Sequence, residues 1–402
     1  MHPDHNVLME EKGFTSFQLN EAILKALEKM GFKDPSAIQC QTIPLIQEGK
    51  DLIALAQTGS GKTAACAIPV CNRVNTDRID VQALIIVPTR ELALQYATEV
   101  QKIGVVKGVK AFAIFGGEDA GMQQSKLKNG VQVLVATPGR LIDFIYSRQI
   151  DISQVETLIL DEADEMLSMG FYDDLEFIIQ CLVHKHQTLL FSATMPPKIR
   201  LLAKLHMQDP QEVNLLGQGA SPKSLQHLFA YGSAHDRDRL LLELIQKMNP
   251  VQAIVFCHSR FQVEKVCRFL KNHISHVDFL HAGLAQDMRS MITGKFRSGK
   301  VQILVATDVV ARGLDFSKVS HVFIYQLPND SDVYVHRSGR TGRYDKEGVV
   351  ISLVTQRELP ALQIILRQLG KLEAEWIGPP PPAHPVQRVQ GQKKGPRKSA
   401  NK

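Results

Sequence analysis

Residues 51–70 read DLIALAQTGSGKTAACAIPV. The apolar run 52–56 predicts a buried strand, and the residues after the glycines predict a helix. A strand, a glycine loop and a helix N-terminus in this order form a phosphate cradle, because backbone N–H groups converge on the phosphate oxygens. We expect Lys62 to reach the β and γ phosphates of a nucleotide and Thr63 to offer its hydroxyl to Mg²⁺. The usual pattern begins with glycine where this chain has Ala56, so a tight strand-to-helix turn without a ligand is the alternative.

Short apolar runs recur along the rest of the chain and alternate with segments of helical periodicity. The runs occupy residues 83–87, 111–115, 131–136, 157–161 and 188–194, and then 253–257, 276–281, 301–308, 321–325 and 348–354. Such alternation is typical of crossover units around a parallel sheet. The second series has no glycine-Lys-Thr loop of its own. The sequence therefore predicts an α/β protein with two tandem domains, each a mostly parallel sheet covered by helices on both faces.

The length of the chain also favours two domains. A chain of 402 residues with 44% hydrophobic content would overstretch a single core. The turn-rich segment GQGASP separates the two series of apolar runs and is the best linker. We expect a lead-in (1–13), a first domain (14–216), a linker (217–224), a second domain (225–377) and a basic, proline-containing, disordered tail (378–402).

The positive charge of the chain is located in this tail. The net charge is +6, and residues 378–402 carry six basic residues and no acidic one. The 41 acidic groups of the remaining chain are therefore balanced by an equal number of basic groups. Any nucleic-acid groove in the two domains must be built by the placement of charges, since there is no bulk excess.

The cysteines and the hydropathy pattern indicate a protein of a reducing compartment. The six cysteines form no C-x-x-C pair and no metal-ligand spacing, so we expect small apolar core residues. No basic N-terminal leader with an apolar run is present, and no apolar segment approaches 18 residues. We expect a cytoplasmic protein that makes no membrane contact.

Acidic residues follow one of the predicted buried strands. In TLILDEADEM, Asp161 stands at the end of the strand and Glu162 comes directly after it. The carboxyl edge of a parallel sheet faces the crevice beside the phosphate loop. There Asp161 can hold Mg²⁺ and Glu162 can orient or deprotonate the attacking water. A solvated acidic loop is the alternative.

An arginine cluster lies near the end of the second domain, in YVHRSGRTGR. It contains Arg337, Arg340 and Arg343, and arginines suit the spread charge of a phosphate. The second domain has no phosphate loop, so arginines from it would be fingers that complete the site of the first domain. A basic surface loop is the alternative.

Taken in order, these motifs resemble those of the DEAD-box RNA helicases, with their two RecA-like domains. The matching segments are AQTGSGKT (56–63), PTRELA (88–93), Gly116-Gly117, TPGR (137–140), DEAD (161–164), SAT (192–194), ATDVVARGLD (306–315) and HRSGRTGR (336–343). The upstream segment GFKDPSAIQ (31–39) looks like the family's adenine-reading segment. The family's phosphate loop begins with alanine, which accounts for Ala56. The resemblance covers about residues 14–370.

The resemblance implies roles in ATP binding and hydrolysis for residues of both domains. Gln39 would hydrogen-bond the adenine edge. The alternative is that Gln39 is only a polar residue at a helix N-terminus. The other cofactor-binding candidates are Phe14, Phe32, Thr58, Gly59, Ser60, Gly61, Lys62, Thr63 and Asp315. The catalytic candidates are Lys62, Asp161, Glu162, Arg340 and Arg343, with Thr63 and Asp161 at Mg²⁺. Ser192, Thr194 and His336 would couple the nucleotide site to domain closure.

The resemblance also implies a strand of RNA bound across both domains. Its candidate contacts are Arg90, Gly117, Thr137, Gly139 and Arg140 in the first domain, and Arg260, Gln286, Arg289 and Thr307 in the second. Arg260 ends VFCHSR, where the family often has Thr-Lys in place of Ser-Arg. Short side chains and glycine N–H groups suit a phosphate backbone, so we expect sequence-independent contacts. Aromatic residues are scarce, and stacking platforms for bases are not indicated.

The expected function is an RNA-dependent ATPase that unwinds short duplexes or remodels RNA–protein complexes by closing two domains on one strand. One alternative is an ATP-gated RNA clamp that serves as an assembly platform, and the motifs are the same for both. A processive translocase on duplex DNA is disfavoured, because the adenine-reading segment and the DEAD motif resemble the RNA-acting branch.

Overall fold

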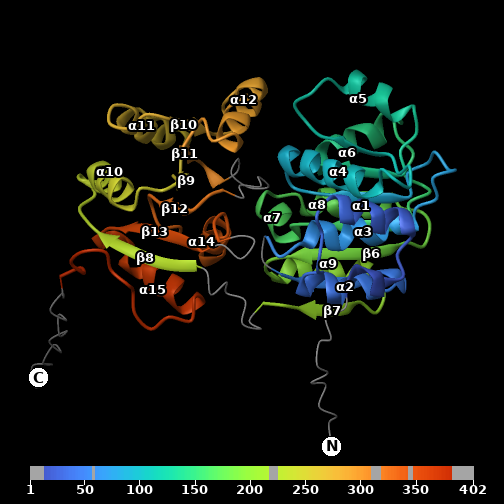
Figure 1. Ribbon diagram of the computed structural model, residues 1–402, viewed down its shortest axis with the longest axis horizontal. Helices are drawn as coiled ribbons and strands as arrows, with labels where there is room; N and C mark the ends of the chain where they lie inside the picture. The colour runs from blue at the N-terminus through green and yellow to red at the C-terminus, as the bar shows by residue number, and fades with distance from the viewer. Residues whose placement is uncertain (1–12, 57–58, 217–224, 309–317, 343–346, 383–402) are drawn as a thin grey trace, which may run out of the picture.

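The computed structural model describes residues 13–56, 59–216, 225–308, 318–342 and 347–382. They form two parallel sheets, each with helices on both faces, placed side by side (Figure 1). The predicted fold class is therefore confirmed. The predicted linker, most of the lead-in and most of the tail lie outside the described residues.

The first sheet places the phosphate loop after β1, the strand next to one edge of the sheet. Among the described residues its strand order is β3-β4-β2-β5-β6-β1-β7, and every pairing is parallel. The strands are β1 (Leu52–Leu55), β2 (Ala83–Ile86), β3 (Ala111–Ile114), β4 (Val133–Ala136), β5 (Thr157–Leu160), β6 (Gln187–Ser192) and β7 (Gln211–Asn214). The neighbouring strands β1 and β6 are followed by connections that run in opposite directions, from β1 toward β2 and from β6 toward the edge strand β7. Ligands of open parallel sheets bind at such a point, beyond the carboxyl ends of the strands.

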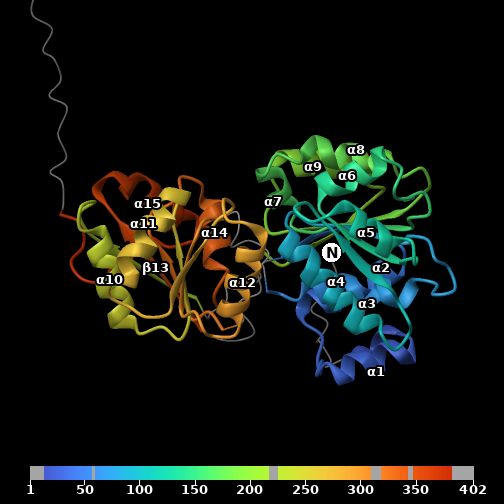
Figure 2. The ribbon, with the colours of Figure 1, turned by 90° about the horizontal axis from the view of Figure 1, so that it is seen from above.

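Helices cover both faces of this sheet, as Figure 2 shows from above. One core joins a face of the sheet to α1 (Glu21–Lys29), α2 (Ala37–Gln47), α3 (Lys62–Arg73) and α4 (Arg90–Gly104), with the 3₁₀ helix η1 (Phe14–Phe17). The other core joins the opposite face to α6 (Pro138–Tyr146), α7 (Ala163–Ser168), α8 (Tyr172–Gln180) and α9 (Pro197–His206). Helix α5 (Ala120–Leu127) follows β3. Successive residues of each strand alternate between the two cores, which explains the continuous apolar runs.

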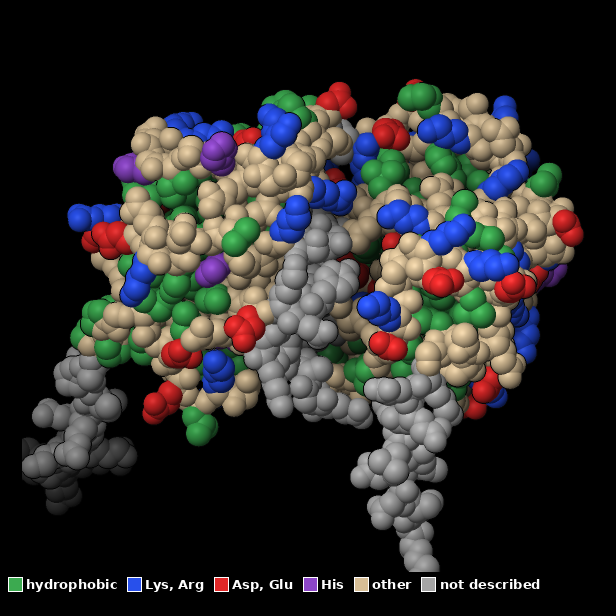
Figure 3. Space-filling view, viewed as in Figure 1, with side chains coloured by type: hydrophobic (Ala, Val, Ile, Leu, Met, Phe, Trp, Pro, Cys, Tyr) green, Lys and Arg blue, Asp and Glu red, His purple; other side chains and the backbone are tan. Residues whose placement is uncertain are grey.

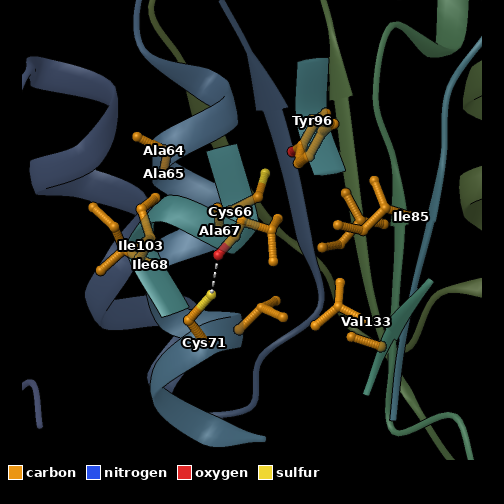
Figure 4. Packing of buried hydrophobic residues seen from close by; sticks show 14 of the residues in the cluster. Ala64, Ala65, Cys66, Ala67, Ile68, Cys71, Ile85, Tyr96, Ile103 and Val133 are labelled. Atoms are coloured by element: carbon orange, nitrogen blue, oxygen red, sulfur yellow. Dashed lines mark hydrogen bonds between the residues drawn. The ribbon is translucent and has the colours of Figure 1, made fainter. Parts of the chain in front are cut away.

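Small side chains let α3 pack closely against the sheet. Ala64, Ala65, Cys66 and Ala67 are all buried, and Figure 4 shows Cys66 and Ala67 on the side of the helix that is nearer to Ile85 and Val133. The Cys71 thiol at the far end donates to the Val100 carbonyl at 3.6 Å. Close packing fixes the axis of α3, and so the direction in which its N-terminus points.

The second sheet has the order β10-β11-β9-β12-β13-β8 within the described residues, again all parallel. Its strands are β8 (Leu225–Tyr231), β9 (Ala253–Phe256), β10 (Val277–Leu280), β11 (Ile303–Ala306), β12 (His321–Ile324) and β13 (Gly348–Val354). Helices α10 (Arg237–Met248) and α11 (Arg260–Lys271) cover one face. Helices α12 (Gln286–Arg297), α14 (Ser331–Ser338) and α15 (Leu359–Gln368), preceded by η2 (Gln356–Glu358), cover the other.

The segment before the proline run belongs to the second domain. Phe229 of the edge strand β8 donates its N–H to the Glu375 carbonyl at 2.8 Å and accepts from the Ile377 N–H at 2.7 Å. The Trp376 ring packs against Phe229 with 6.1 Å between ring centroids. This pairing covers part of an open sheet edge, which would otherwise present unpaired backbone groups.

The strands predicted from apolar runs are all present, and the sequence reasoning missed two others. β7 is polar except for Val213 and has three exposed residues, because it pairs only with β1 at the sheet edge. β8 begins the second domain and mixes polar with apolar residues.

Most of the cysteines are the small apolar core residues that the sequence predicts. All six are unpaired, and four of them are buried: Cys66, Cys71, Cys257 and Cys267. Cys40 and Cys181 are only partly buried. In the described part of the chain, no helix is both long and apolar enough to cross a membrane.

Candidate active site and strand-binding surface

The glycine loop joins β1 to the first turn of α3. Gly59 and Gly61 have φ of 86° and 97°, a conformation that L side chains rarely adopt. A Cβ on Gly61 would also lie 2.8 Å from Gln39 Nε2. The Ser60 hydroxyl is buried without a hydrogen-bond partner among the described residues. A buried donor of this kind and free helix N–H groups are what a phosphate requires.

Lys62 lies at the start of α3 and is 6% exposed. Its ammonium donates to the Ala56 carbonyl at 2.7 Å, so the side chain is folded back over its own loop. Thr63 follows and is half-buried. The predicted ligand Thr58 lies outside the described residues.

Helix α2 supports the loop from one side. The Gln39 side chain accepts from the Ser36 N–H at 2.9 Å, which completes a capping box, and donates to the Gly61 carbonyl at 3.2 Å. The Ser36 hydroxyl donates to the Ser60 carbonyl at 2.9 Å. Gln39 is therefore a capping residue as well as a neighbour of the phosphate loop. Its predicted contact with adenine stays a prediction.

The two candidate aromatic residues meet beside this helix. Phe14 and Phe32 pack edge to face with 5.8 Å between their centroids. Phe14 is 6% exposed and belongs to the first core. The pair joins the start of the domain to the segment that carries Gln39.

Asp161 stands at the carboxyl end of β5 and is 2% exposed. Its carboxylate accepts from the Glu162 N–H at 2.8 Å. Burial raises the pKa of Asp161 to about 6, although the nearby Lys62 ammonium favours the ionised form. A positive charge next to this carboxylate would stabilise its ionised state. Glu162 has φ 53° and ψ 48°, a left-handed conformation that is uncommon outside glycine and often marks a functional site.

Asp164 connects the site to the second domain, and the sequence reasoning gave it no role. Its carboxylate accepts from the Thr194 N–H and hydroxyl, both at 2.8 Å, and lies 3.5 Å from His336 Nε2 of α14. Its N–H donates to the Ser192 hydroxyl at 3.2 Å. The Ser192 carbonyl in turn accepts from the Ala56 N–H at 3.0 Å. The three residues predicted to couple the domains thus meet at Asp164, beside the phosphate loop.

The charges of this cluster are mutually stabilised. Burial opposes ionisation of Asp164, but the His336 hydrogen bond and charge, together with Lys62 and Thr194, hold its pKa below the usual range. Burial likewise opposes protonation of His336, yet the hydrogen bond and charge of Asp164 raise its pKa. Both shifts favour the charged forms, and the contact is an ion pair between the two domains when His336 is protonated.

The arginine cluster divides into two kinds of residue. Arg337 is 2% exposed and forms a two-pronged ion pair with Asp308 at 2.6 and 2.8 Å, so it belongs to the interior of the second domain. Arg340 is also buried, and its Nε donates to the His336 carbonyl at 3.2 Å, which places it one turn from the domain contact. The predicted finger Arg343 and the ribose candidate Asp315 lie outside the described residues.

In the first domain the structure brings together two candidate strand-binding arginines. Arg90 begins α4, and Arg140 lies in the first turn of α6. Arg90 Nη2 lies 2.5 Å from a Glu118 carboxylate oxygen, and Arg140 Nη2 donates to the Glu118 carbonyl at 3.0 Å. Gly117 follows β3, and Thr137 and Gly139 follow its parallel neighbour β4, so all of them lie at the carboxyl edge of the sheet.

In the second domain the candidates are more dispersed. Arg260 is exposed at the start of α11, whereas Thr307 is 9% exposed. Arg289 of α12 pairs with Glu91 of α4 at 2.7 Å, a second ion pair between the domains. Gln286 begins α12, and its side chain lies outside the description.

Lys and Arg side chains are scattered over both domains among acidic and apolar ones, as Figure 3 shows for one face. This agrees with the balanced charge of the body of the chain. Among the described residues, no group of three His, Cys, Asp or Glu could hold a metal ion alone.

Comparison with known proteins gives this geometry its family. The "DEAD/DEAH box helicase" model matches residues 36–202, and the "Helicase conserved C-terminal domain" model matches residues 236–345. The ATP-dependent RNA helicase CshA of Listeria monocytogenes is 43% identical over 352 residues, which are 88% of this chain and 68% of the relative. CshA of Geobacillus kaustophilus is 43% identical over 91% of this chain and 79% of its own.

Solved structures agree with these sequence relatives. Dbp5 of Saccharomyces cerevisiae bound to RNA and ADP BeF3 is 30% identical, with a TM-score of 0.84 over 91% of this chain and 95% of that one. Mss116p bound to single-stranded RNA and AMP-PNP has a TM-score of 0.83 at 30% identity, over 93% of this chain and 81% of that one. The chain belongs to the DEAD-box helicase family, and its two sheets are tandem RecA-like domains.

Proposed function

We propose that this chain is an RNA-dependent ATPase that locally unwinds short RNA duplexes or remodels RNA–protein complexes. The observation that carries the proposal is the position of Asp164. It contacts Ser192 and Thr194 beside the phosphate loop and His336 of the second domain. A nucleotide in the loop would therefore influence the contact between the domains. The likeness to Dbp5 bound to RNA and ADP BeF3, at a TM-score of 0.84, supports the same arrangement for the active state.

ATP would occupy the glycine loop at the N-terminus of α3. The Lys62 ammonium would exchange the Ala56 carbonyl for the β and γ phosphates, and the Ser60 hydroxyl would gain the partner that it lacks. The backbone N–H groups of Gly59 and Gly61 would complete the cradle. Gln39 would turn its amide toward adenine, with Phe14 and Phe32 packed nearby.

The residues present suit Mg²⁺, because Thr63 and Asp161 offer hard oxygen ligands and the phosphates would supply the others. Bound there, the ion would neutralise negative charge on the phosphates. This chain's own part is to hold the Asp161 carboxylate ionised beside Lys62, although burial raises its pKa to about 6.

Glu162 would orient and deprotonate the attacking water. Its left-handed backbone directs the residue away from the regular path of α7, at the edge where the phosphates would lie. Arg340 and Arg343 would stabilise the transferring phosphoryl group from the second domain, which can raise the rate by about 10³-fold or more.

RNA would lie along the carboxyl edges of both sheets. The contacts would be Arg90, Gly117, Thr137, Gly139 and Arg140 on the first domain, and Arg260, Gln286, Arg289 and Thr307 on the second. Contacts to phosphates carry no sequence information, so binding would be independent of sequence. ATP and RNA would each favour closure, and each should therefore tighten the binding of the other.

The domain limits 14–216 and 225–377 and a cytoplasmic location are part of the same proposal. Within the second domain, the pairing of Ile377 with Phe229 supports the limit at residue 377.

Displacement of one strand from a short RNA duplex tests the proposal. The unmodified protein should release the strand when ATP is present. Lys62→Ala should lose both strand release and ATP hydrolysis. Glu162→Gln should bind ATP and hold RNA for longer, because closure survives while the attacking water is not activated. Hydrolysis at the parental rate by Glu162→Gln would contradict the role of Glu162, and ATP hydrolysis without any strand release would favour the RNA clamp.

A further inference from the structure

Glu118 contacts both of the partly buried arginines on the strand-binding edge of the first domain. Its carboxylate lies 2.5 Å from Arg90 Nη2, and its backbone carbonyl accepts from Arg140 Nη2 at 3.0 Å. The second carboxylate oxygen accepts from Gln123 Nε2 at 3.4 Å. One residue therefore supplies acceptors to two cations that come from different helices.

The two arginines have donors to spare. Arg90 Nε and Nη1 and Arg140 Nη1 are buried without a hydrogen-bond partner among the described residues. The guanidinium groups are held in place by aromatic rings, with Arg90 4.4 Å from the Phe115 centroid and Arg140 5.6 Å from that of Phe144. Fixed, under-satisfied guanidinium groups favour an anion with several acceptor oxygens, which a phosphate is.

The Glu118 side chain is open to solvent. Its side chain is 42% exposed, whereas that of Arg90 is 13% exposed. It follows Gly117, whose φ of 83° marks a turn, and precedes α5. Movement of the carboxylate into water would leave the arginines and their aromatic supports unchanged.

We propose that Glu118 is an acidic placeholder, which occupies the position of an RNA phosphate between Arg90 and Arg140 and is displaced when RNA binds. The inference rests on the proposed function, since it concerns the same RNA-binding edge. While the edge is empty, the carboxylate neutralises Arg90 and the backbone carbonyl of the same residue accepts from Arg140. RNA must exchange with it, so Glu118 weakens RNA binding and lowers its dependence on salt.

Replacement of Glu118 by glutamine tests this directly. The amide keeps an oxygen for Arg90 and the backbone keeps its carbonyl for Arg140, so the change removes charge with little change of shape. An exposed ion pair of this kind corresponds to about a two- to five-fold change in affinity. Glu118→Gln should therefore bind single-stranded RNA about two- to five-fold more tightly at low salt. The slope of log K against log salt should steepen by about 0.7, the value for one further contact on a single strand.

Glu156→Gln is the matched control. Glu156 pairs with Arg78 at 2.6 Å and its side chain is 44% exposed, so this carboxylate is close to that of Glu118 in ion-pair distance and exposure, although Arg78 is more exposed than Arg90. It precedes β5 and therefore lies at the opposite edge of the sheet from Arg90, which follows β2. The control changes net charge equally and should leave RNA affinity and its salt slope unchanged.

The measurement is fluorescence anisotropy of a labelled RNA oligonucleotide with the full chain and AMP-PNP, over a series of salt concentrations. Unchanged or weaker binding by Glu118→Gln, relative to Glu156→Gln, would overturn the inference. Arg90→Ala separates this failure from that of the proposed function. If Arg90→Ala weakens RNA binding and Glu118→Gln does not strengthen it, only the placeholder role fails. If Arg90→Ala does not change RNA affinity, the assignment of this edge as the RNA-binding surface is wrong.

Discussion

Replacement of His336 by alanine should uncouple the nucleotide site from the second domain. The imidazole lies 3.5 Å from the Asp164 carboxylate, and the two side chains are 11% and 5% exposed. Asp164 keeps its hydrogen bonds from Thr194 when the imidazole is removed, so the first domain should stay folded. The substitution should therefore destabilise the closed arrangement of the two domains and leave the fold of the first domain intact.

The size of the effect follows from the geometry. Two unit charges 3.5 Å apart attract by about 5 kcal/mol at an effective dielectric constant of about 20. Desolvation of both groups on closure offsets much of this attraction. We expect a remainder of about 1–3 kcal/mol, which is a factor of about 5–150 in affinity.

The assay is RNA affinity with AMP-PNP bound, compared with AMP-PNP affinity in the absence of RNA. His336→Ala should weaken RNA affinity by about 5–150-fold and leave AMP-PNP affinity in the absence of RNA nearly unchanged. His235→Ala is the control, because this exposed histidine lies in the same domain away from the contact. Parental RNA affinity in His336→Ala would refute the reasoning.

The same contact predicts a dependence on pH. The pKa of His336 is raised from 6.5 when the domains meet, so its contribution is fully present below about pH 6.5 and is lost as the pH rises through the higher value. The pKa of Asp164 is lowered, so its own contribution fails only in acid, below the ordinary carboxylate range. RNA affinity with AMP-PNP should fall on the alkaline side of pH 6.5, by at most about ten-fold per pH unit for one proton. A flat profile in the unmodified protein would contradict this account.

Three further predictions concern other parts of the chain. An amide paired with adenine gives about 1–3 kcal/mol of discrimination between bases, so the protein should hydrolyse ATP in preference to GTP. Gln39→Glu should keep the acceptor of the capping box but reduce the preference for ATP. Equal hydrolysis of both nucleotides by the unmodified protein would exclude adenine recognition by Gln39. Arg237 forms a buried ion pair with Glu358 and donates to the Tyr325 carbonyl at 2.8 Å. Arg237→Ala should cost about 3–5 kcal/mol in urea unfolding of the second domain, whereas the exposed Arg239→Ala should have little effect. A chain ending at Ile377 keeps the pairing with β8 but loses the six basic residues of the tail, so its log K for RNA should depend less on log salt, by about 1–3 in slope; an unchanged slope would leave the tail without a role in RNA binding.

Much of the fold could be predicted because parallel strands buried on both faces are continuous apolar runs. The run 83–87 supplies Ile85 to one core and Leu84 to the other, so every position is apolar. β7 escaped prediction because one buried residue, Val213, leaves no such pattern. Its place is set by pairing with β1, and not by its own composition.

The phosphate loop could be read from the sequence because its residues are consecutive. The contact between Asp164 and His336 could not, since it joins residues far apart in the chain and in different domains. Glu118 was missed for a different reason. A role for its carboxylate can be inferred only from its contacts with Arg90 and Arg140, and these three residues come from separate segments of the chain.

The same limit applies to the arginine cluster. The spacing of the arginines could not distinguish the roles of Arg337 and Arg340. Arg337 pairs with Asp308 inside the second domain, whereas Arg340 lies one turn beyond His336, which contacts the first domain. Arg337 lies in the last turn of α14, whereas Arg340 lies in the turn that follows the helix, and the spacing of the arginines does not show where the helix ends.

Steady-state ATP hydrolysis, measured with single-stranded RNA, with DNA of the same sequence and with no nucleic acid, tests the central claim most directly. The account predicts slow hydrolysis by the protein alone, a large increase in kcat with RNA and a much smaller one with DNA. Hydrolysis at the same rate with and without RNA would contradict it, because closure on RNA would then have no part in assembling the site.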